Sequence, residues 1–91
     1  MRDLCLENRD IFKLVDNENN RQLAKWGIQD HEPFTWLGFA TEELGELSEA
    51  ISAHKWRDGL VEDVVDEAIQ VATLCLKIAE MYQATLVRKL A

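Results

Sequence analysis

The last third of the chain, residues 60–90, contains neither glycine nor proline, and its apolar residues recur at helical spacing. This pattern predicts one helix over about residues 60–90, roughly 45 Å long at ~1.5 Å per residue. The apolar residues cover nearly half of its circumference, which predicts packing against more than one neighbour. They are Val61, Val64, Val65, Ala68, Ile69, Val71, Ala72, Cys75, Ile78, Ala79 and Tyr82.

Two further helices are predicted before this one. The first covers about residues 7–26 and ends at Gly27, a suitable C-cap. The second covers about residues 33–54; it starts at Pro33, which the first turn tolerates, with its N-cap at His31 or Glu32. The expected core face of the second helix is the stripe Leu37, Ala40, Leu44, Leu47, Ser48 and Ile51.

No stretch of the chain alternates apolar and polar residues for long, so strands are not expected. The predicted fold class is all-α, a helical bundle of three main helices with room for a fourth short one. The 91 residues suffice for one domain, residues 1–91. A domain of this size buries only about 60% of its unfolded surface. Because 47% of the residues are nevertheless hydrophobic, we expect a homodimer or homotetramer with a shared core.

The net charge is −7, from 10 basic and 17 acidic residues. This charge repels the phosphate backbone and argues against a nucleic acid polymer as partner. No apolar run reaches the ~18 residues of a membrane span, and none follows Met1, so we expect no membrane partner and a cytoplasmic location. Cys5 and Cys75 are expected to be free thiols in a reducing compartment.

Acidic residues crowd one short stretch of the second predicted helix. Glu43 and Glu46 share a stripe with the aromatic residues Trp36 and Phe39, which a fully solvated face would not usually carry. Glu42 and Glu49 lie further round the helix and are expected to face solvent.

A second acidic run begins the third predicted helix. Asp63 and Asp66 share a strip with Gln70, Lys77 and Met81, and Glu67 lies at the edge of that strip. Solvation, together with the preference of acids for the first turn of a helix, is the alternative explanation for these residues.

Each acidic pair, Glu43/Glu46 and Asp63/Asp66, has i, i+3 spacing, which makes the two side chains neighbours on a helix. Two such pairs on antiparallel helices can converge on Mg²⁺, which prefers oxygen ligands and usually keeps water and phosphate in its shell. Magnesium held in this way polarises a phosphate and activates water. The pattern therefore predicts a magnesium site, with a solvated surface as the alternative.

The run Glu42-Glu43-Leu44-Gly45-Glu46, followed by Asp63-Val64-Val65-Asp66, resembles the EExxE…ExxD signature of the MazG-like all-α nucleoside triphosphate pyrophosphatases. Residues 25–31, Lys-Trp-Gly-Ile-Gln-Asp-His, and Trp36 look like the stretch before that signature in short integron- and phage-type members. The resemblance covers about residues 8–82.

This resemblance implies hydrolysis of the α–β phosphoanhydride of (deoxy)nucleoside triphosphates to a monophosphate and pyrophosphate, as nucleotide-pool house-cleaning. It implies Mg²⁺, with Mn²⁺ as a substitute, held by Glu43, Glu46, Asp63 and Asp66. Asp63 departs from the glutamate of the family, and the adjacent Glu62 is an alternative ligand. Glu43 or Glu46 is also expected to orient or deprotonate the attacking water as a catalytic residue.

Other residues are candidates for binding the substrate, each with a simpler structural role as the alternative. The candidates are Lys25, Lys55 and Lys77 for phosphates, Trp36 and Trp56 for stacking, and His31 and Gln70 for other contacts.

Rival functions are a phosphoribosyl-ATP pyrophosphatase, against which the Lys-Trp-Gly stretch argues, and a non-catalytic oligomerisation module. A di-iron bundle is disfavoured because the sequence has no Glu-x-x-His pair.

Overall fold

The computed structural model describes residues 6–90, and within that range it contains three helices and no strand. The helices are α1 (Ile11–Trp26), α2 (Pro33–Trp56) and α3 (Val61–Leu90). The predicted all-α class and the three main helices are therefore confirmed. α1 begins about four residues later than predicted, and α2 continues two residues further.

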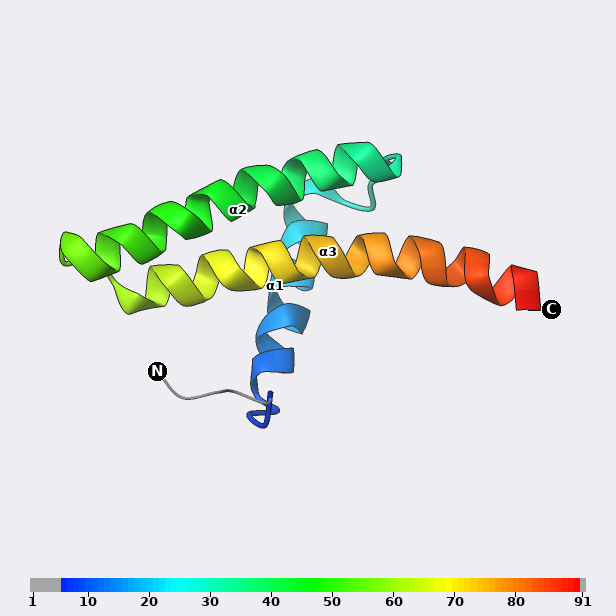
Figure 1. Ribbon diagram of the computed structural model, residues 1–91. Helices are drawn as coiled ribbons and strands as arrows, with labels where there is room; N and C mark the ends of the chain where they lie inside the picture. The colour runs from blue at the N-terminus through cyan, green and yellow to red at the C-terminus, as the bar shows by residue number, and fades with distance from the viewer. Residues whose placement is uncertain (1–5, 91) are drawn as a thin grey trace.

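The helices α2 and α3 form an antiparallel hairpin, and α1 crosses α3 (Figure 1). The backbone of α1 packs against α3 and stands away from α2. Side chains of all three helices consequently line a pocket between α1 and the hairpin. Within residues 6–90, no helix combines the length and apolar character needed to span a membrane.

A small buried core joins α2 to α3. Trp36 and Ala40 of α2 pack with Leu74 of α3, and Ile78 and Met81 cover this cluster. The residues that meet across the hairpin are spaced by three and four along each helix, as in paired helices generally. They include Trp36, Ala40 and Glu43 on α2 and Glu67, Gln70 and Leu74 on α3.

The stripe predicted to be the core face of the second helix is wrong in part. Ala40 is buried, but Leu37, Leu44 and Ile51 remain 49%, 54% and 48% exposed. The stripe that carries Trp36 faces α3 instead, because burying an indole removes more apolar surface from water than burying a leucine.

The helix caps predicted at the two ends of the first loop are present in the structure. Gly27 closes α1 with φ of 70°, a left-handed value that favours glycine, and its N–H donates to the Leu23 carbonyl oxygen over 2.8 Å. Glu32 is the N-cap of α2, and its carboxylate accepts hydrogen bonds from the N–H groups of Phe34 and Thr35.

The exposed cysteine Cys75 lies on α3. Cys5 lies outside the described residues, so the prediction of two free thiols remains untested.

The turn between α2 and α3 requires glycine at position 59. The Gly59 N–H donates to the Ala53 carbonyl oxygen over 2.9 Å, and the Gly59 carbonyl oxygen lies 2.9 Å from Nδ1 of His54. A Cβ at position 59 would lie 2.8 Å from the Cβ of Ala53 and 2.9 Å from its carbonyl carbon. This close approach fixes how α3 starts relative to α2.

We expect Gly59→Ala to lower the free energy of unfolding by about 1–3 kcal/mol, because the added methyl forces the turn apart. Gly38→Ala is the matched control, since no side chain or distant backbone lies within 4 Å of a Cβ added there. In mid-helix this change should raise stability by about 0.5–1 kcal/mol. Urea unfolding followed by circular dichroism measures both, and equal effects of the two variants would contradict the account of the turn.

Candidate metal centre and adjoining pocket

Three carboxylates from two helices converge in the middle of the hairpin. Glu43 and Glu46 come from α2 and Glu67 comes from α3, and one carboxylate oxygen of each lies within 4.8 Å of the others. The i, i+3 spacing places the first two on one face of α2. The antiparallel packing of α3 then brings the third opposite them.

Two oxygens of this cluster are buried without a hydrogen-bond partner. In the described part of the chain, Oε2 of Glu43 and Oε2 of Glu67 receive no donor. Buried carboxylate oxygens are ordinarily paired, because leaving them unpaired costs free energy. The chain itself thus supplies no donor to these two oxygens, which suits a site that takes up a cation.

Two carboxyl groups of this cluster have pKa values above the ordinary value for glutamate. Burial raises the pKa of Glu43 to about 7, and the neighbouring carboxylates of Glu67 and Glu46 add to the rise. Burial likewise raises the pKa of Glu67, assisted by the charges of Glu46 and Asp63. A metal ion binding here would compete with protons near neutral pH.

The two predicted aspartates lie outside this group of three. Asp63 is exposed and lines a groove with Glu46 and Glu67 near the closed end of the hairpin. Asp66 is exposed and lines a different groove, next to α1, with Glu18 and Arg21. Successive residues are turned by about 100° on a helix, so Glu67 and Asp66 cannot face α2 together.

The ligand roles of Glu43, Glu46, Asp63 and Asp66 remain predictions, and the geometry favours Glu67 over Asp66 as the contribution of α3. Asp63 remains a candidate for a further ligand because it borders the same groove as Glu46 and Glu67. Glu62, the alternative to Asp63, is exposed and is not part of the converging group.

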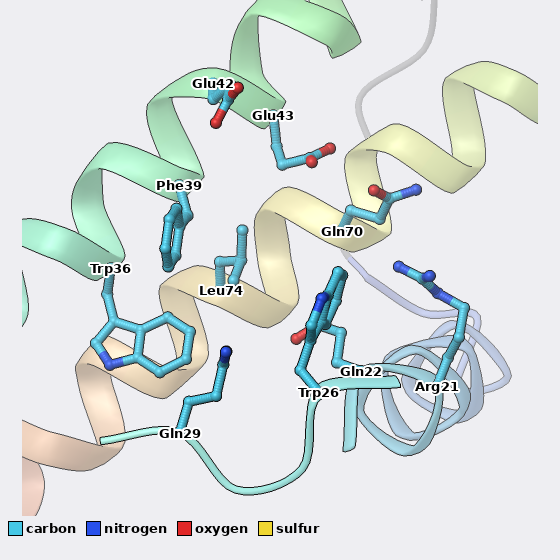
Figure 2. Close-up of a pocket in the computed structure, with 10 residues that line it drawn as sticks. All are labelled: Arg21, Gln22, Trp26, Gln29, Trp36, Phe39, Glu42, Glu43, Gln70 and Leu74. Carbon is cyan, nitrogen blue, oxygen red and sulfur yellow. The ribbon is translucent and has the colours of Figure 1, made fainter. Parts of the chain in front are cut away.

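A pocket of about 290 Å³ adjoins the carboxylates (Figure 2). Its walls are aromatic, with Trp26 from α1 facing Trp36 and Phe39 from α2, and Leu74 of α3 lies between them. The side chain of Glu43 stands at one end of the pocket. The remaining lining residues are Arg21, Gln22, Gln29, Glu42 and Gln70.

Four of the predicted substrate-binding residues lie in or beside this pocket. Trp36 and Gln70 line it. Lys25 lies over the Trp26 ring at 4.6 Å from its centre, at the edge of the pocket. Lys77 lies 5.2 Å from the centre of the Trp36 ring and donates a hydrogen bond to Oε1 of Gln22. This position places Lys77 at the aromatic end.

His31 lies behind the aromatic wall. Its ring meets those of Trp36 and Phe39 edge-on, with centroids 5.0 and 5.5 Å away. Its Nε2 is buried and has no hydrogen-bond partner among the described residues. The structure therefore places His31 as a support of the stacking surface rather than in the lining of the pocket.

Lys55 and Trp56 are not brought to the pocket of their own chain. They lie at the end of α2 next to the turn, about 20 Å along the helix from Glu43. Trp56 is 70% exposed, and the Lys55 ammonium lies over its ring. Their predicted role in substrate binding has no support from the geometry of a single chain.

Sequence reasoning missed Glu67 and Arg21 as site residues. Glu67 follows Asp63 by four residues, a spacing that places the two on one face of a helix. Arg21 and the buried Gln22 follow the polar run 17–20, where apolar spacing is interrupted. That interruption was the available signal, because a helix with a polar stretch in its middle presents polar groups to its neighbours.

Comparison of this chain with protein-family models, with curated proteins and with solved structures finds no match.

The pKa of Glu43 predicts how stability depends on pH in the absence of metal. The folded chain holds the proton more tightly than the unfolded chain, whose pKa is near 4.5. This contribution to stability is therefore complete below about pH 4.5 and is lost as the pH rises through about 7.

In the presence of a chelator, we accordingly expect Glu43→Gln to become more stable relative to wild type as the pH rises from about 5 to 7.5. Thermal unfolding across this range measures the difference. Glu80→Gln, which removes an exposed acid of α3, is the control and should run parallel to wild type. A parallel profile for Glu43→Gln would contradict the raised pKa.

Proposed function

We propose that this chain is a Mg²⁺-dependent nucleoside triphosphate pyrophosphohydrolase. It would cleave the α–β phosphoanhydride and release a monophosphate and pyrophosphate, acting on the nucleotide pool of the cytoplasm. The observation that carries the proposal is the convergence of Glu43, Glu46 and Glu67, with two buried and unpartnered oxygens, beside an aromatic pocket.

The donor set suits a hard divalent cation. Glu43, Glu46 and Glu67 offer carboxylate oxygens alone, which Mg²⁺ and Mn²⁺ accept, and Asp63 borders the same groove. When bound, the ion supplies polarisation of a phosphate and a lowered pKa of bound water. Glu43 or Glu46 is also proposed to orient or deprotonate the attacking water.

The pocket suits a nucleoside. Trp26, Trp36 and Phe39 provide flat apolar surfaces, and stacking of a base on such rings is worth about 1–3 kcal/mol. Gln22 and Gln29 bring amide groups that both donate and accept hydrogen bonds. With a base at this end, the phosphates extend towards Glu43, where an acidic wall repels them unless a cation is bound.

The active form is proposed to be a homodimer or homotetramer. Leu37, Leu44 and Ile51 recur every seven residues along α2, and each is about half exposed. Such a stripe is typical of a helix that packs against another helix. A second copy would bury it and enlarge the small core formed by Trp36, Ala40 and Leu74.

Pyrophosphate release from all common nucleoside triphosphates and from phosphoribosyl-ATP, with and without Mg²⁺, tests the activity. We expect Mg²⁺-dependent release that a chelator abolishes. Glu46→Gln and Glu67→Gln should each reduce it by about 100-fold or more and leave the helical content unchanged, because each removes a charged oxygen ligand. Asp16→Asn, which removes an exposed acid of α1, is the control.

Asp66→Asn separates the two ligand sets. If Glu67 is the ligand from α3, Asp66→Asn keeps most of the activity and Glu67→Gln loses it. If instead Asp66→Asn loses the activity and Glu67→Gln keeps it, Asp66 is the ligand, as the sequence predicts. Thermal unfolding with added Mg²⁺ gives a second measurement, since a bound ion stabilises the folded state. If Mg²⁺ changes neither stability nor nucleotide binding, a non-catalytic oligomerisation module is the better assignment.

Light scattering tests the assembly. The wild type should have two or four times the mass of one chain, and Leu44→Glu should lower that mass because a charge would be buried in the interface. Lys13→Glu, an exposed change on α1, should leave the mass unaltered. A wild-type protein with the mass of one chain would contradict the shared core.

A further inference from the structure

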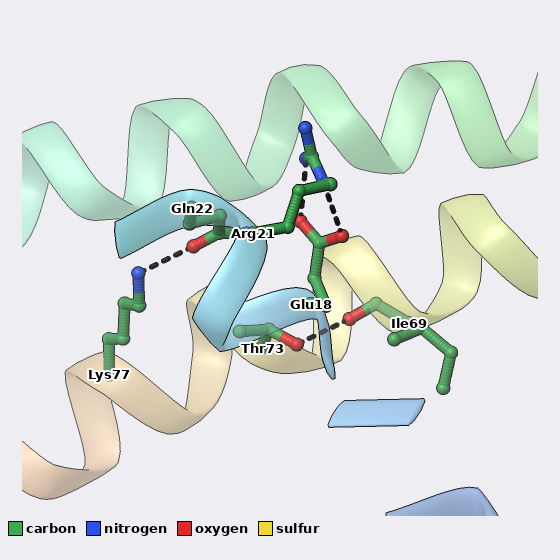
Figure 3. Close-up of polar contacts among 6 residues, drawn as sticks. All are labelled: Glu18, Arg21, Gln22, Ile69, Thr73 and Lys77. Carbon is green, nitrogen blue, oxygen red and sulfur yellow. Dashed lines mark hydrogen bonds and ion pairs between the residues drawn. The ribbon is translucent and has the colours of Figure 1, made fainter. Parts of the chain in front are cut away.

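Arg21 of α1 is held in a fixed position by a carboxylate. Its Nε donates to Oε1 of Glu18 over 2.8 Å, and its Nη2 donates to Oε2 over 2.7 Å (Figure 3). Oε2 of Glu18 also accepts a hydrogen bond of 2.7 Å from Nε2 of Gln22. The Glu18 side chain is only 10% exposed, so this ion pair is well shielded from water on the carboxylate side.

The remaining N–H groups of the guanidinium have no hydrogen-bond partner among the described residues, and the group lies 5.8 Å from the centre of the Trp26 ring. An arginine carries five N–H donors, and the pair with Glu18 uses only two of them. The guanidinium points across the pocket towards Gln70 and Glu43 (Figure 2). The hydrogen bond with Glu18 raises the pKa of Arg21, and the charges of Glu18 and Glu43 add to the rise.

Among the described residues, 6–90, Arg21 is the one cation that lines this pocket. The Lys77 ammonium is engaged by Gln22 and the Trp36 ring, and the Lys25 ammonium lies over the Trp26 ring. Arg57 and Lys13 pair with Glu49 and Asp10 on the exposed surface. The pocket therefore combines aromatic walls with a cation that lies beside Trp26 and points towards Glu43 of the carboxylate cluster.

We propose that Arg21 binds the phosphates beyond the α-phosphate, and that Glu18 is the positioning residue that holds it there. This makes the site select nucleoside di- and triphosphates over monophosphates, and it rests on the proposed function. The planar guanidinium matches two phosphate oxygens at once, and such charge-assisted hydrogen bonds are about twice as strong as neutral ones. A monophosphate lacks those oxygens, so Arg21 would favour substrate over the nucleotide product.

Calorimetric binding of inorganic tripolyphosphate in the presence of Mg²⁺ isolates the phosphate contacts from those of the base. We expect Arg21→Gln to weaken this binding by about 10- to 100-fold, the loss typical of hydrogen bonds to charged groups. Binding of nucleoside monophosphates should change by less than about threefold. Lys13→Gln removes the same charge from the same helix and should leave both unchanged.

Two further variants test whether the position of the guanidinium matters. They also guard against mistaking a misfolded Arg21→Gln variant for a loss of phosphate binding. Arg21→Lys keeps the positive charge and the helix but removes the planar guanidinium that binds two oxygens at once. We expect it to weaken tripolyphosphate binding by about tenfold. Glu18→Gln should weaken it by about three- to tenfold, because the guanidinium is no longer held. Wild-type affinity in Glu18→Gln would overturn the positioning role.

Direct titration with Mg²⁺ alone distinguishes this inference from the proposed function. If Arg21→Gln binds Mg²⁺ as the wild type does and loses tripolyphosphate, the inference is supported. If Arg21→Gln binds Mg²⁺ and tripolyphosphate as the wild type does, Arg21 has no such role and the metal site stands. If the wild type binds neither probe, both the proposed function and this inference fail.

Discussion

The carboxylates of Glu43 and Glu67 face each other between two packed helices, and much of the rest of the structure can be understood from that contact. Like charges at this distance repel, and burial removes the water that would screen them. A proton or a cation relieves this repulsion. The raised pKa values of both groups correspond to the first of these, a bound proton. A divalent metal, as in the proposed function, would be the second.

The surrounding packing holds this unfavourable contact in place. The cluster of Trp36, Ala40 and Leu74 joins the helices on one side of it, and the close turn at Gly59 joins them on the other. The helix α1 packs on α3 alone, and a hydrogen bond from Lys77 to Gln22 links the two helices. A helix attached in this way leaves a pocket beside α2 instead of a filled core.

The proposal of a nucleotide ligand rests on the pocket and the carboxylates together. Aromatic rings and amides suit a base, whereas Glu43 and Arg21 form an end of opposite charges. In the proposed function, phosphate would approach this end once a cation offsets the carboxylates, and the guanidinium would bind the remaining oxygens. The half-exposed leucines of α2 have no part in this pocket, and a second copy of the chain is their proposed partner.

The sequence by itself determined whatever depends on local geometry. The three helices, the caps at Gly27 and Glu32, and the pairing of Glu43 with Glu46 all follow from residues a few positions apart. Only the tertiary structure decided which side of each helix faces its neighbour. A helical period fixes angles within one helix but not the rotation of one helix against another, which depends on the aromatic surface to be buried and on the turn that joins the pair. For that reason Glu67 rather than Asp66 meets α2.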